Sequence, residues 1–398
     1  MSGARVLAIM GSGETAPTMV KVHRSLFVPP GVVLDTPYGF QENADDISAK
    51  AVEYFRESVG QALSVASFRS AGAAAEDPVG YETMLASLRS AWYVFAGPGS
   101  PSYALRQWQD SLVPSVLEAK LRDGGVVCFA SAAALTLGRF TVPVYEIYKV
   151  GEEPRWLDGL DLLGSALGMS VAVIPHFNNA EGGNHDTRFC YLGERRLRML
   201  ESQLPDGAFV LGVDEHTGLV IDLDAGTASV VGLGCVTVRR DGVVAAVHES
   251  GSVVEVASLG SGSGGSVGGG PVATPAREAG PRAAQSPLAE RVAELERLAE
   301  AEPVRAILEL DAELVAWSRD TTQSDELDVA RAALRAMVVR LGASVRPVEP
   351  FVEALVSVRS SLRAAGHWDD ADVVRQALEG LGVEVRDGKE GSSWRLLS

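Results

Sequence analysis

The sequence of 398 residues has few cysteines, few aromatic residues and no long apolar run. Cys128, Cys190 and Cys235 are its only cysteines, and none forms a CxxC pair of the kind that holds zinc or performs redox chemistry. We therefore expect three buried thiols. No stretch reaches the roughly 18 consecutive apolar residues that a membrane-spanning helix needs, so we expect no membrane partner.

Basic residues are also in the minority, with 35 Lys and Arg against 52 Asp and Glu and a net charge of −17. This charge favours solubility and weakens non-specific attraction to phosphate backbones, which disfavours a general nucleic-acid-binding protein. The N-terminus passes from MSGAR directly into VLAIM, without a charged leader, an apolar segment and a cleavage site. We therefore expect a cytoplasmic protein.

Composition divides the chain into two domains joined by a linker. Residues 258–286 are rich in Gly, Ser, Ala and Pro and nearly empty of large apolar residues. Such a segment cannot bury enough apolar surface to offset its ordering entropy, which predicts a flexible linker. We expect one domain over residues 1–257 and a second over residues 287–398.

The first domain alternates short apolar runs with longer amphipathic segments. The runs VLAIM, ALSVASF, AWYVFAG and GVVCFA are separated by segments such as ISAKAVEYFRESVG and SLVPSVLEAKLRDG. This alternation predicts an α/β fold with a doubly wound, mostly parallel, flavodoxin-like sheet whose site lies at the carboxyl ends of the strands. Closely spaced apolar runs after residue 207 predict antiparallel strands at one edge.

The second domain reads as a small helical domain. Apolar residues recur at helical spacing in LAERVAELERLAEAEPVRAILELDAELVAWSRD and in three further segments. The terminal VEVRDGKEGSSWRLL predicts a β-hairpin.

The first chemical signal is GVVCFASAAAL, residues 125–135, in which an apolar strand runs into Ser131. A G-x-S-x-G turn presents a nucleophilic serine because its strained backbone demands small residues two positions before and after. Phe129 and Ala133 occupy those positions here. The alternative role of Ser131 is an ordinary helix N-cap.

Two other predicted strands end in polar residues. One ends at His176 in IPHFNNA, and another ends at Asp214 and Glu215 in LGVDEHT. Serine, histidine and carboxylate at three strand ends of one sheet would supply a nucleophile, a base and a group that orients the base.

These segments carry a resemblance. FAGPGSPSYALR, GGVVCFASAAA, PHFNNAEGGNHDTRFCYLGERRLRMLE and GVDEHTGLVI together resemble the cyanophycinase and dipeptidase E family of serine peptidases, which have the class I glutamine amidotransferase-like fold. The resemblance implies Ser131 as nucleophile, His176 as base and Glu215 as acid. It also implies a small, acidic peptide or related amide as substrate. An oxyanion hole would come from the following loop glycines and backbone amide: Gly97, Gly99 and Ala132.

Further polar residues are candidates for substrate binding: Glu14, Tyr148, Glu181, His185, Asp186, Arg188, Asp214 and His216. Arg188 could clamp a substrate carboxylate, and Tyr148 either lines the pocket or belongs to the solvated face of a strand. The histidines and carboxylates of the 176–188 loop raise the alternative of a divalent metal, but their spacing matches no tight ligand motif. We expect neither metal nor cofactor, and a hydrogen-bonded polar network is the simpler interpretation of this loop.

A second resemblance covers residues 351–397, which look like the C-terminal region of cysteinyl-tRNA synthetases. The matching positions are Arg359, Arg363, Ala371, Asp372, Arg375, Gly382, Asp387, Gly391 and Trp394. The HIGH and KMSKS signatures and the zinc cysteines of those enzymes are absent, which excludes aminoacylation by this chain. From residue 287 onward, 14 Lys and Arg face 21 Asp and Glu (14 − 21 = −7), so tRNA contact competes with protein binding or simple packing.

Two functional hypotheses follow. The first is a serine-type hydrolase that uses Ser131, His176 and Glu215 on a small peptide or amide. The alternative is a catalytically degenerate module that senses a small molecule and is linked to tRNA through the C-terminal domain. Either is compatible with a homo-oligomer.

Overall fold

The computed structural model describes residues 4–182, 185–261, 286–320, 326–344, 349–388 and 391–396. They form two compact units: Met1–Leu295 with Leu308–Arg331, and Glu296–Ile307 with Ala332–Ser398. Most of the predicted linker, residues 262–285, lies outside the described residues. The domain boundaries at 257 and 286 therefore stay a prediction.

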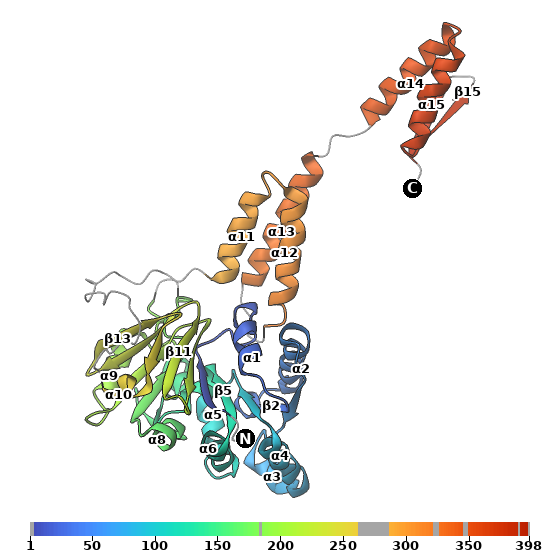
Figure 1. The fold of residues 1–398 in the computed structure, drawn as a ribbon. Coiled ribbons are helices and arrows are strands. Elements are labelled where there is room, and N and C mark those ends of the chain that lie inside the picture. Colours follow the sequence, from blue (N-terminus) through green and yellow to red (C-terminus); the bar gives the residue numbers. More distant parts are fainter. Residues whose placement is uncertain are drawn as a thin grey trace. The chain divides into compact units, whose positions relative to one another are not determined.

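The larger sheet of the first unit confirms the α/β prediction (Figure 1). Its order is β14 (Val253–Glu255), β11 (Thr227–Gly232), β10 (Thr217–Asp222), β1 (Arg5–Met10), β5 (Gly125–Ala130), β4 (Tyr93–Ala96), β2 (Gly31–Leu34) and β3 (Leu63–Ala66). Strands β1 to β5 pair in parallel, whereas β10, β11 and β14 pair antiparallel at one edge. Apolar residues on both faces of the parallel strands fit this arrangement, because helices cover such sheets on both sides.

The strands that precede His176 and Glu215 lie in a second sheet, which corrects the expectation of one sheet. Its order is β13 (Val243–Glu249), β12 (Cys235–Arg240), β9 (Phe209–Val213), β8 (Val171–Ile174), β6 (Phe140–Thr141) and β7 (Leu157–Asp158). The two sheets meet at their strand ends, where the N–H of His176, after β8, donates to the carbonyl of Gly11, after β1 (3.3 Å). Residues from both sheets therefore converge after β1, β8 and β9.

Helices of the first unit connect and cover the strands (Figure 1). They are α1 (Val20–Leu26), α2 (Ala44–Tyr54), α3 (Ala71–Glu76), α4 (Pro78–Ser90), α5 (Pro101–Trp108), α6 (Val113–Asp123), α7 (Ser131–Leu135), α8 (Leu162–Leu167), α9 (Gly193–Glu201) and α10 (Val256–Ser261). Successive side chains of β1 enter different cores: Leu7 and Ile9 pack with Phe129, and Val6 and Met10 pack on the opposite face. This alternation fixes the register of the central strands.

The C-terminal region is helical and ends in a β-hairpin, as predicted. Its elements are α11 (Pro287–Leu298), α12 (Pro303–Trp317), α13 (Glu326–Ser344), α14 (Glu349–Ala364), α15 (Trp368–Gly380), β15 (Val383–Gly388) and β16 (Gly391–Leu396). In the second unit, Val356, Leu378 and Val385 form a small core, and Arg359 makes two hydrogen bonds to Asp387 (2.7 and 2.8 Å). Across the described ranges, every helix is too short or too polar to cross a bilayer.

Candidate active site

Ser131 begins α7 directly after β5 with a backbone φ of 47°. This left-handed conformation is unusual for a residue other than glycine, and it is typical of the strained turn that presents a nucleophile. No side chain caps the start of α7. Instead, the Ser131 Oγ lies 3.0 Å from the His176 Nε2. The structure therefore does not give Ser131 the N-cap role.

Phe129 and Ala133 leave room for this turn in different ways. The Phe129 side chain is fully buried in the core and packs against the Trp108 ring, with ring centroids 5.7 Å apart. Ala133 is also fully buried, and its N–H donates to the Gly97 carbonyl (3.2 Å). The phenyl group thus points into the core, and the turn forms without its usual glycines.

His176 follows β8 and has a φ of 47° as well. Its Nδ1 lies 2.9 Å from the Glu215 Oε1, and its Nε2 faces Ser131. An ionised carboxylate only accepts hydrogen bonds, so the Nδ1 carries the proton and the Nε2 accepts from the serine hydroxyl. Hydroxyl, imidazole and carboxylate are aligned in the order that a serine hydrolase uses.

Burial and mutual charge shift the pKa values of both His176 and Glu215. Burial lowers the pKa of His176, but the hydrogen bond and charge of Glu215 outweigh this effect and the pKa is raised above its ordinary value. Burial raises the pKa of Glu215, and the opposing hydrogen bond from His176 brings it below its usual range. Each shift favours the charged form, which suits an imidazole that must hold a proton during a reaction.

Two asparagines that sequence reasoning missed position Glu215. The Asn179 amide donates to the Glu215 Oε1 (3.1 Å), and the Glu215 N–H donates to the Asn178 Oδ1 (2.8 Å). Both asparagines lie two and three residues after His176, in the segment PHFNN. Their closeness to His176 in the sequence could have identified them, because a tight turn after the histidine brings both asparagines to the end of β9.

The 97–99 loop, expected to form the oxyanion hole, lies beside the strained turn at Ser131, which we call the elbow. The hydrogen bond from the Ala133 N–H to the Gly97 carbonyl connects the two segments. Gly99 has a φ of 137°, and a Cβ at this position would lie 2.0 Å from the Pro37 carbonyl oxygen. Only glycine fits there. Ala132, the second residue of α7, follows the serine.

Glu14 lies next to this loop, with its Oε1 3.0 Å from the position that a Cβ on Gly97 would occupy. The carboxyl group is fully buried, and neither oxygen has a hydrogen-bond partner among the described residues. Burial, together with the charge of Asp320, raises the pKa of Glu14 to about 7. The sequence suggested Glu14 as a substrate-binding residue. In the structure its side chain is fully buried and is not among the residues that border the cavity described next.

A cavity of about 580 Å³ opens beside His176 and Glu215. Glu181 and His216 border it, as does Tyr191, which sequence reasoning missed. Tyr148 lies behind Tyr191, with ring centroids 5.2 Å apart. Its segment forms a helical turn, Glu146–Val150, and not the strand that one interpretation assumed. The volume is typical of small-molecule sites.

Asp214 holds the first residue of the neighbouring strand β12. It is buried, and its Oδ2 accepts the Cys235 N–H (3.0 Å) and contacts the Cys235 Sγ (3.1 Å). Cys128 and Cys190 are buried as expected, whereas Cys235 is partly exposed.

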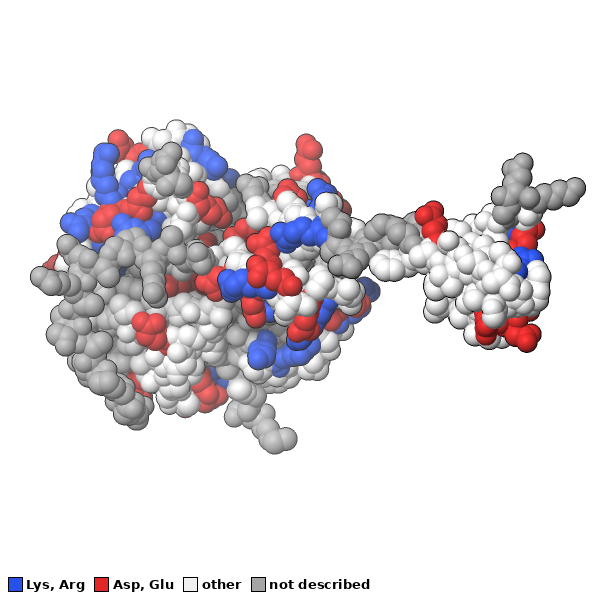
Figure 2. Space-filling model, turned by 90° about the horizontal axis from the view of Figure 1, so that it is seen from above, with Lys and Arg blue, Asp and Glu red and all other residues white. Residues whose placement is uncertain are grey.

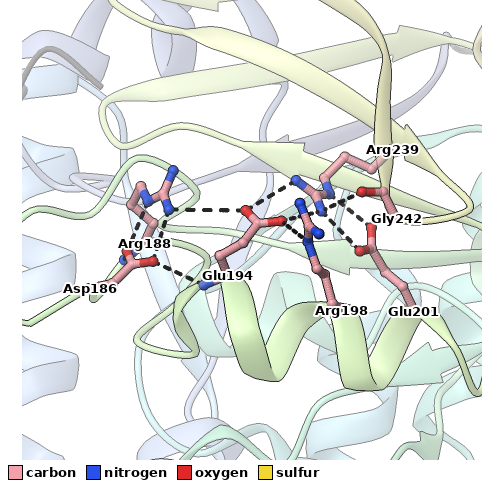
Figure 3. Close-up of polar contacts among 7 residues, drawn as sticks. All are labelled: Asp186, Arg188, Glu194, Arg198, Glu201, Arg239 and Gly242. Carbon is pink, nitrogen blue, oxygen red and sulfur yellow. Dashed lines mark hydrogen bonds and ion pairs between the residues drawn. The ribbon is translucent and has the colours of Figure 1, made fainter. Parts of the chain in front are cut away.

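Arg188, Asp186 and His185 do not border the cavity. Two nitrogens of Arg188 each lie 2.8 Å from an oxygen of Asp186, which also accepts the Glu194 N–H (3.0 Å; Figure 3). The His185 residue is exposed. Arg188 is therefore paired with Asp186 and, away from the cavity, is not placed to bind a substrate carboxylate.

The rest of this network holds α9 against β12. Arg239 is only 5% exposed and bonds to both Glu201 oxygens (2.8 and 2.9 Å) and to Glu194 (Figure 3). Arg198 also reaches Glu194 (2.8 Å). Over the ranges that the structure describes, no three His, Cys, Asp or Glu side chains gather in an arrangement that could hold a metal ion.

Comparison with protein families finds a match at the C-terminus. Residues 347–395 match the model of the cysteinyl-tRNA ligase anticodon-binding domain. The cysteine-tRNA ligase of Azotobacter vinelandii is 39% identical over 59 residues, which are 15% of this chain and 13% of that protein. That of Pseudomonas aeruginosa strain LESB58 is 47% identical over 45 residues, 11% of this chain and 10% of its own. The chain thus spans only a small part of these relatives.

Comparison with solved structures finds matches to the first part of the chain. A peptidase from an acI-B1 actinobacterium superposes with a TM-score of 0.51 and 18% identity, over 64% of this chain and 98% of its own. A putative peptidase E protein from Listeria monocytogenes has a TM-score of 0.38 and 12% identity, over 58% of this chain and all of its own. The chain therefore combines a peptidase-like fold with a segment similar to the anticodon-binding domain of cysteinyl-tRNA ligases.

Proposed function

We propose that this protein is a serine-type hydrolase of small peptides or related amides. The observation that carries the proposal is the alignment of the Ser131 Oγ, the His176 imidazole and the Glu215 carboxylate over hydrogen bonds of 3.0 and 2.9 Å. The positive φ of Ser131 supports the same role, because such strain persists only where the surrounding structure imposes it. The second hypothesis, a degenerate sensing module, does not require this alignment.

In the proposed mechanism, the Ser131 hydroxyl attacks the substrate carbonyl while His176 takes its proton. The carboxylate of Glu215 stabilises the resulting imidazolium. Backbone N–H groups of Ala132 and the 97–99 loop would stabilise the oxyanion. The imidazole then returns the proton to the leaving amine, and water releases the acyl group from the serine by the same steps.

A dipeptide library tests the proposal. We expect the full chain to hydrolyse some members, with amine release followed by mass spectrometry. Ser131→Ala and His176→Ala should each lower the rate by at least about a thousandfold, because nucleophile and base act as a unit. Ser12→Ala, which changes a serine that borders the cavity, serves as the control. Equal rates for Ser131→Ala and Ser12→Ala would contradict the proposal.

RNA binding by the second unit is a second candidate, favoured by the family match at residues 347–395. The charges oppose broad phosphate contact: Arg359 and Arg363 pair with Asp387, and Arg375 pairs with Glu379. The face of α14, α15 and the β-hairpin that Figure 2 shows is mostly uncharged and carries only a few basic side chains. Contact would therefore depend on shape and a few bases more than on counterion release.

An electrophoretic shift assay tests this candidate with cysteine tRNA and an unrelated RNA hairpin. We expect tRNA to bind several-fold more tightly than the hairpin, with a weak dependence on salt. Equal affinity for both RNAs, or a shift that vanishes at moderate salt, would contradict it.

A further inference from the structure

The turn of residues 11–15, directly after β1, packs closely against the residues that follow β8 and β9. The Gly11 carbonyl accepts the His176 N–H (3.3 Å). A Cβ on Gly13 would lie 2.2 Å from the His216 Nδ1, so only glycine leaves room for this imidazole. The backbone of the turn is therefore held beside the base of the proposed mechanism.

The side chain of Glu14, in the same turn, lies against Gly97 of the 97–99 loop. Its Oε1 is 3.0 Å from the position of a Cβ on Gly97, whose carbonyl accepts the Ala133 N–H (3.2 Å). The carboxyl group is fully buried, and neither oxygen has a hydrogen-bond partner among the described residues. An acid in such a place is costly, and groups of this kind concentrate at functional sites.

The histidine that is hydrogen-bonded to this turn does not neutralise the carboxylate. His23 is fully buried, with its Nε2 2.6 Å from the Glu14 carbonyl and its Nδ1 2.7 Å from the Tyr93 hydroxyl. A carbonyl only accepts, so the Nε2 carries the proton and the Nδ1 accepts from the tyrosine. Burial lowers the pKa of His23 to about 4. His23 is therefore uncharged at neutral pH and holds the backbone of the turn.

Titratable groups from several elements face Glu14. They are Tyr54 of α2, Cys128 of β5, His176 and Asp320. Burial raises the pKa values of Tyr54 and Cys128, so both stay neutral. Burial and the charge of Asp320 raise the pKa of Glu14 to about 7, and the charge of His176 opposes this rise. A carboxylate at Glu14 and an imidazolium at His176 therefore stabilise each other.

The base is surrounded by more than one acid. The titratable groups that face His176 are Glu14, Glu181, Glu215, Tyr191 and His216. Burial lowers the pKa of His176, whereas the hydrogen bond and charge of Glu215, followed by the charges of Glu14 and Glu181, raise it above its ordinary value. Tyr191 and His216 stay neutral, because burial raises the pKa of the first and lowers that of the second.

We propose that Glu14 is a positioning residue of this site, whose buried carboxylate stabilises the protonated form of His176 through space. The inference rests on the proposed function, because it concerns the base of the same reaction. In that reaction His176 carries a positive charge while the oxyanion exists. Glu14 does not border the cavity, so it acts through His176 and not on the substrate. Charges interact over longer distances in a buried region than in water.

NMR titration of the full-length protein with ¹³C-labelled histidine tests the proposal. The His176 signal is the one that is lost in His176→Ala. In Glu14→Gln, which keeps the shape of the side chain and removes its charge, we expect the midpoint of the His176 titration to fall by at least about 0.5 pH unit. Glu14→Asp keeps the charge and should retain most of the wild-type midpoint. Glu255→Gln, at an exposed position of β14, is the control and should leave the midpoint unchanged.

Three results would overturn the proposal: an unchanged midpoint in Glu14→Gln, equal shifts in Glu14→Gln and Glu14→Asp, or unfolding of Glu14→Gln, which would show a structural role instead. The titration does not depend on hydrolysis. The expected shift in a protein that hydrolyses no dipeptide would therefore count against the proposed function alone. Hydrolysis without the shift would count against the role of Glu14 alone.

Discussion

Ser131, His176 and His216 all have positive φ values, between 47° and 51°, although none is glycine. Each such conformation costs on the order of 1–3 kcal/mol and persists only when its surroundings enforce it. The sequence identified Ser131 and His176 from their places at strand ends. It could not predict their backbone strain, because local propensity opposes positive φ at serine and histidine. Long-range packing around the elbow decides the conformation.

Phe129 shows how the elbow departs from its usual glycine pattern. Because its ring is fully buried against Trp108, Phe129→Ala should lower the free energy of unfolding by about 3–5 kcal/mol. We expect Phe40→Ala, at a position that is 52% exposed, to cost less than about 1 kcal/mol. Urea unfolding measures both. Similar losses for the two variants would contradict the packing described for Phe129.

Glu14 predicts a pH-dependent stability. Its native pKa is about 7 and its ordinary value is 4.5, so between these values the native state holds more protons than the unfolded state. Stability should therefore fall as pH rises through this window, by about 2–3 kcal/mol between about pH 5 and about pH 8. Glu14→Gln removes the titrating group, so it should gain this amount over the wild-type chain at the higher pH.

Urea unfolding at the two pH values checks the difference, with the exposed Glu255→Gln as control. If the difference in unfolding free energy between Glu14→Gln and wild type does not change with pH, the native pKa of Glu14 is not raised, which would contradict its burial.

At the scale of elements, the sequence predicted the order of helices and strands well, since apolar runs and amphipathic segments alternate clearly. It placed His176 and Glu215 correctly at the ends of strands β8 and β9. It did not show that these strands form a separate sheet, because strand pairing depends on contacts between distant segments. The sequence also did not show that Arg188 pairs with Asp186, because this contact depends on how the loop folds.

The network in Figure 3 gives a prediction for the packing of α9 on β12. Arg239→Ala would leave Glu201, which is 4% exposed, as an unpaired buried carboxylate. We expect a loss of about 3–5 kcal/mol in unfolding free energy. Arg198→Ala, which removes a side chain that is 67% exposed, should cost less than about 1 kcal/mol. Thermal unfolding compares the two, and equal losses would contradict a structural role for Arg239.

At the scale of the whole molecule, two compact units carry different resemblances. The C-terminal resemblance was readable because its arginines, glycines and tryptophan recur at fixed spacings. The contribution of residues 308–331 to the first unit was not, since nothing local marks Trp317 or Asp320 as neighbours of the cavity. Composition gave the net charge, but only the fold shows that acids gather around this cavity.

The division into units predicts separable stabilities. Arg359 is 2% exposed and holds Asp387, whose pKa its charge-assisted hydrogen bonds bring well below the usual range. Arg359→Ala should therefore destabilise the second unit by about 1–3 kcal/mol, the range for hydrogen bonds to charged groups, and shift one calorimetric transition only. The more exposed Arg375→Ala should have little effect. A shift of every transition by Arg359→Ala would contradict independent units.

The central claim is that Ser131 is an activated nucleophile, and covalent labelling tests it most directly. The full chain is treated with a fluorophosphonate, and the adduct is detected by intact mass and located by peptide mapping. We predict one adduct, on Ser131, that is lost in Ser131→Ala and His176→Ala and kept in Ser12→Ala. Labelling should rise with pH through a value above the ordinary pKa of histidine, because His176 accepts the proton only when neutral. No adduct, or one on another serine, would contradict the account.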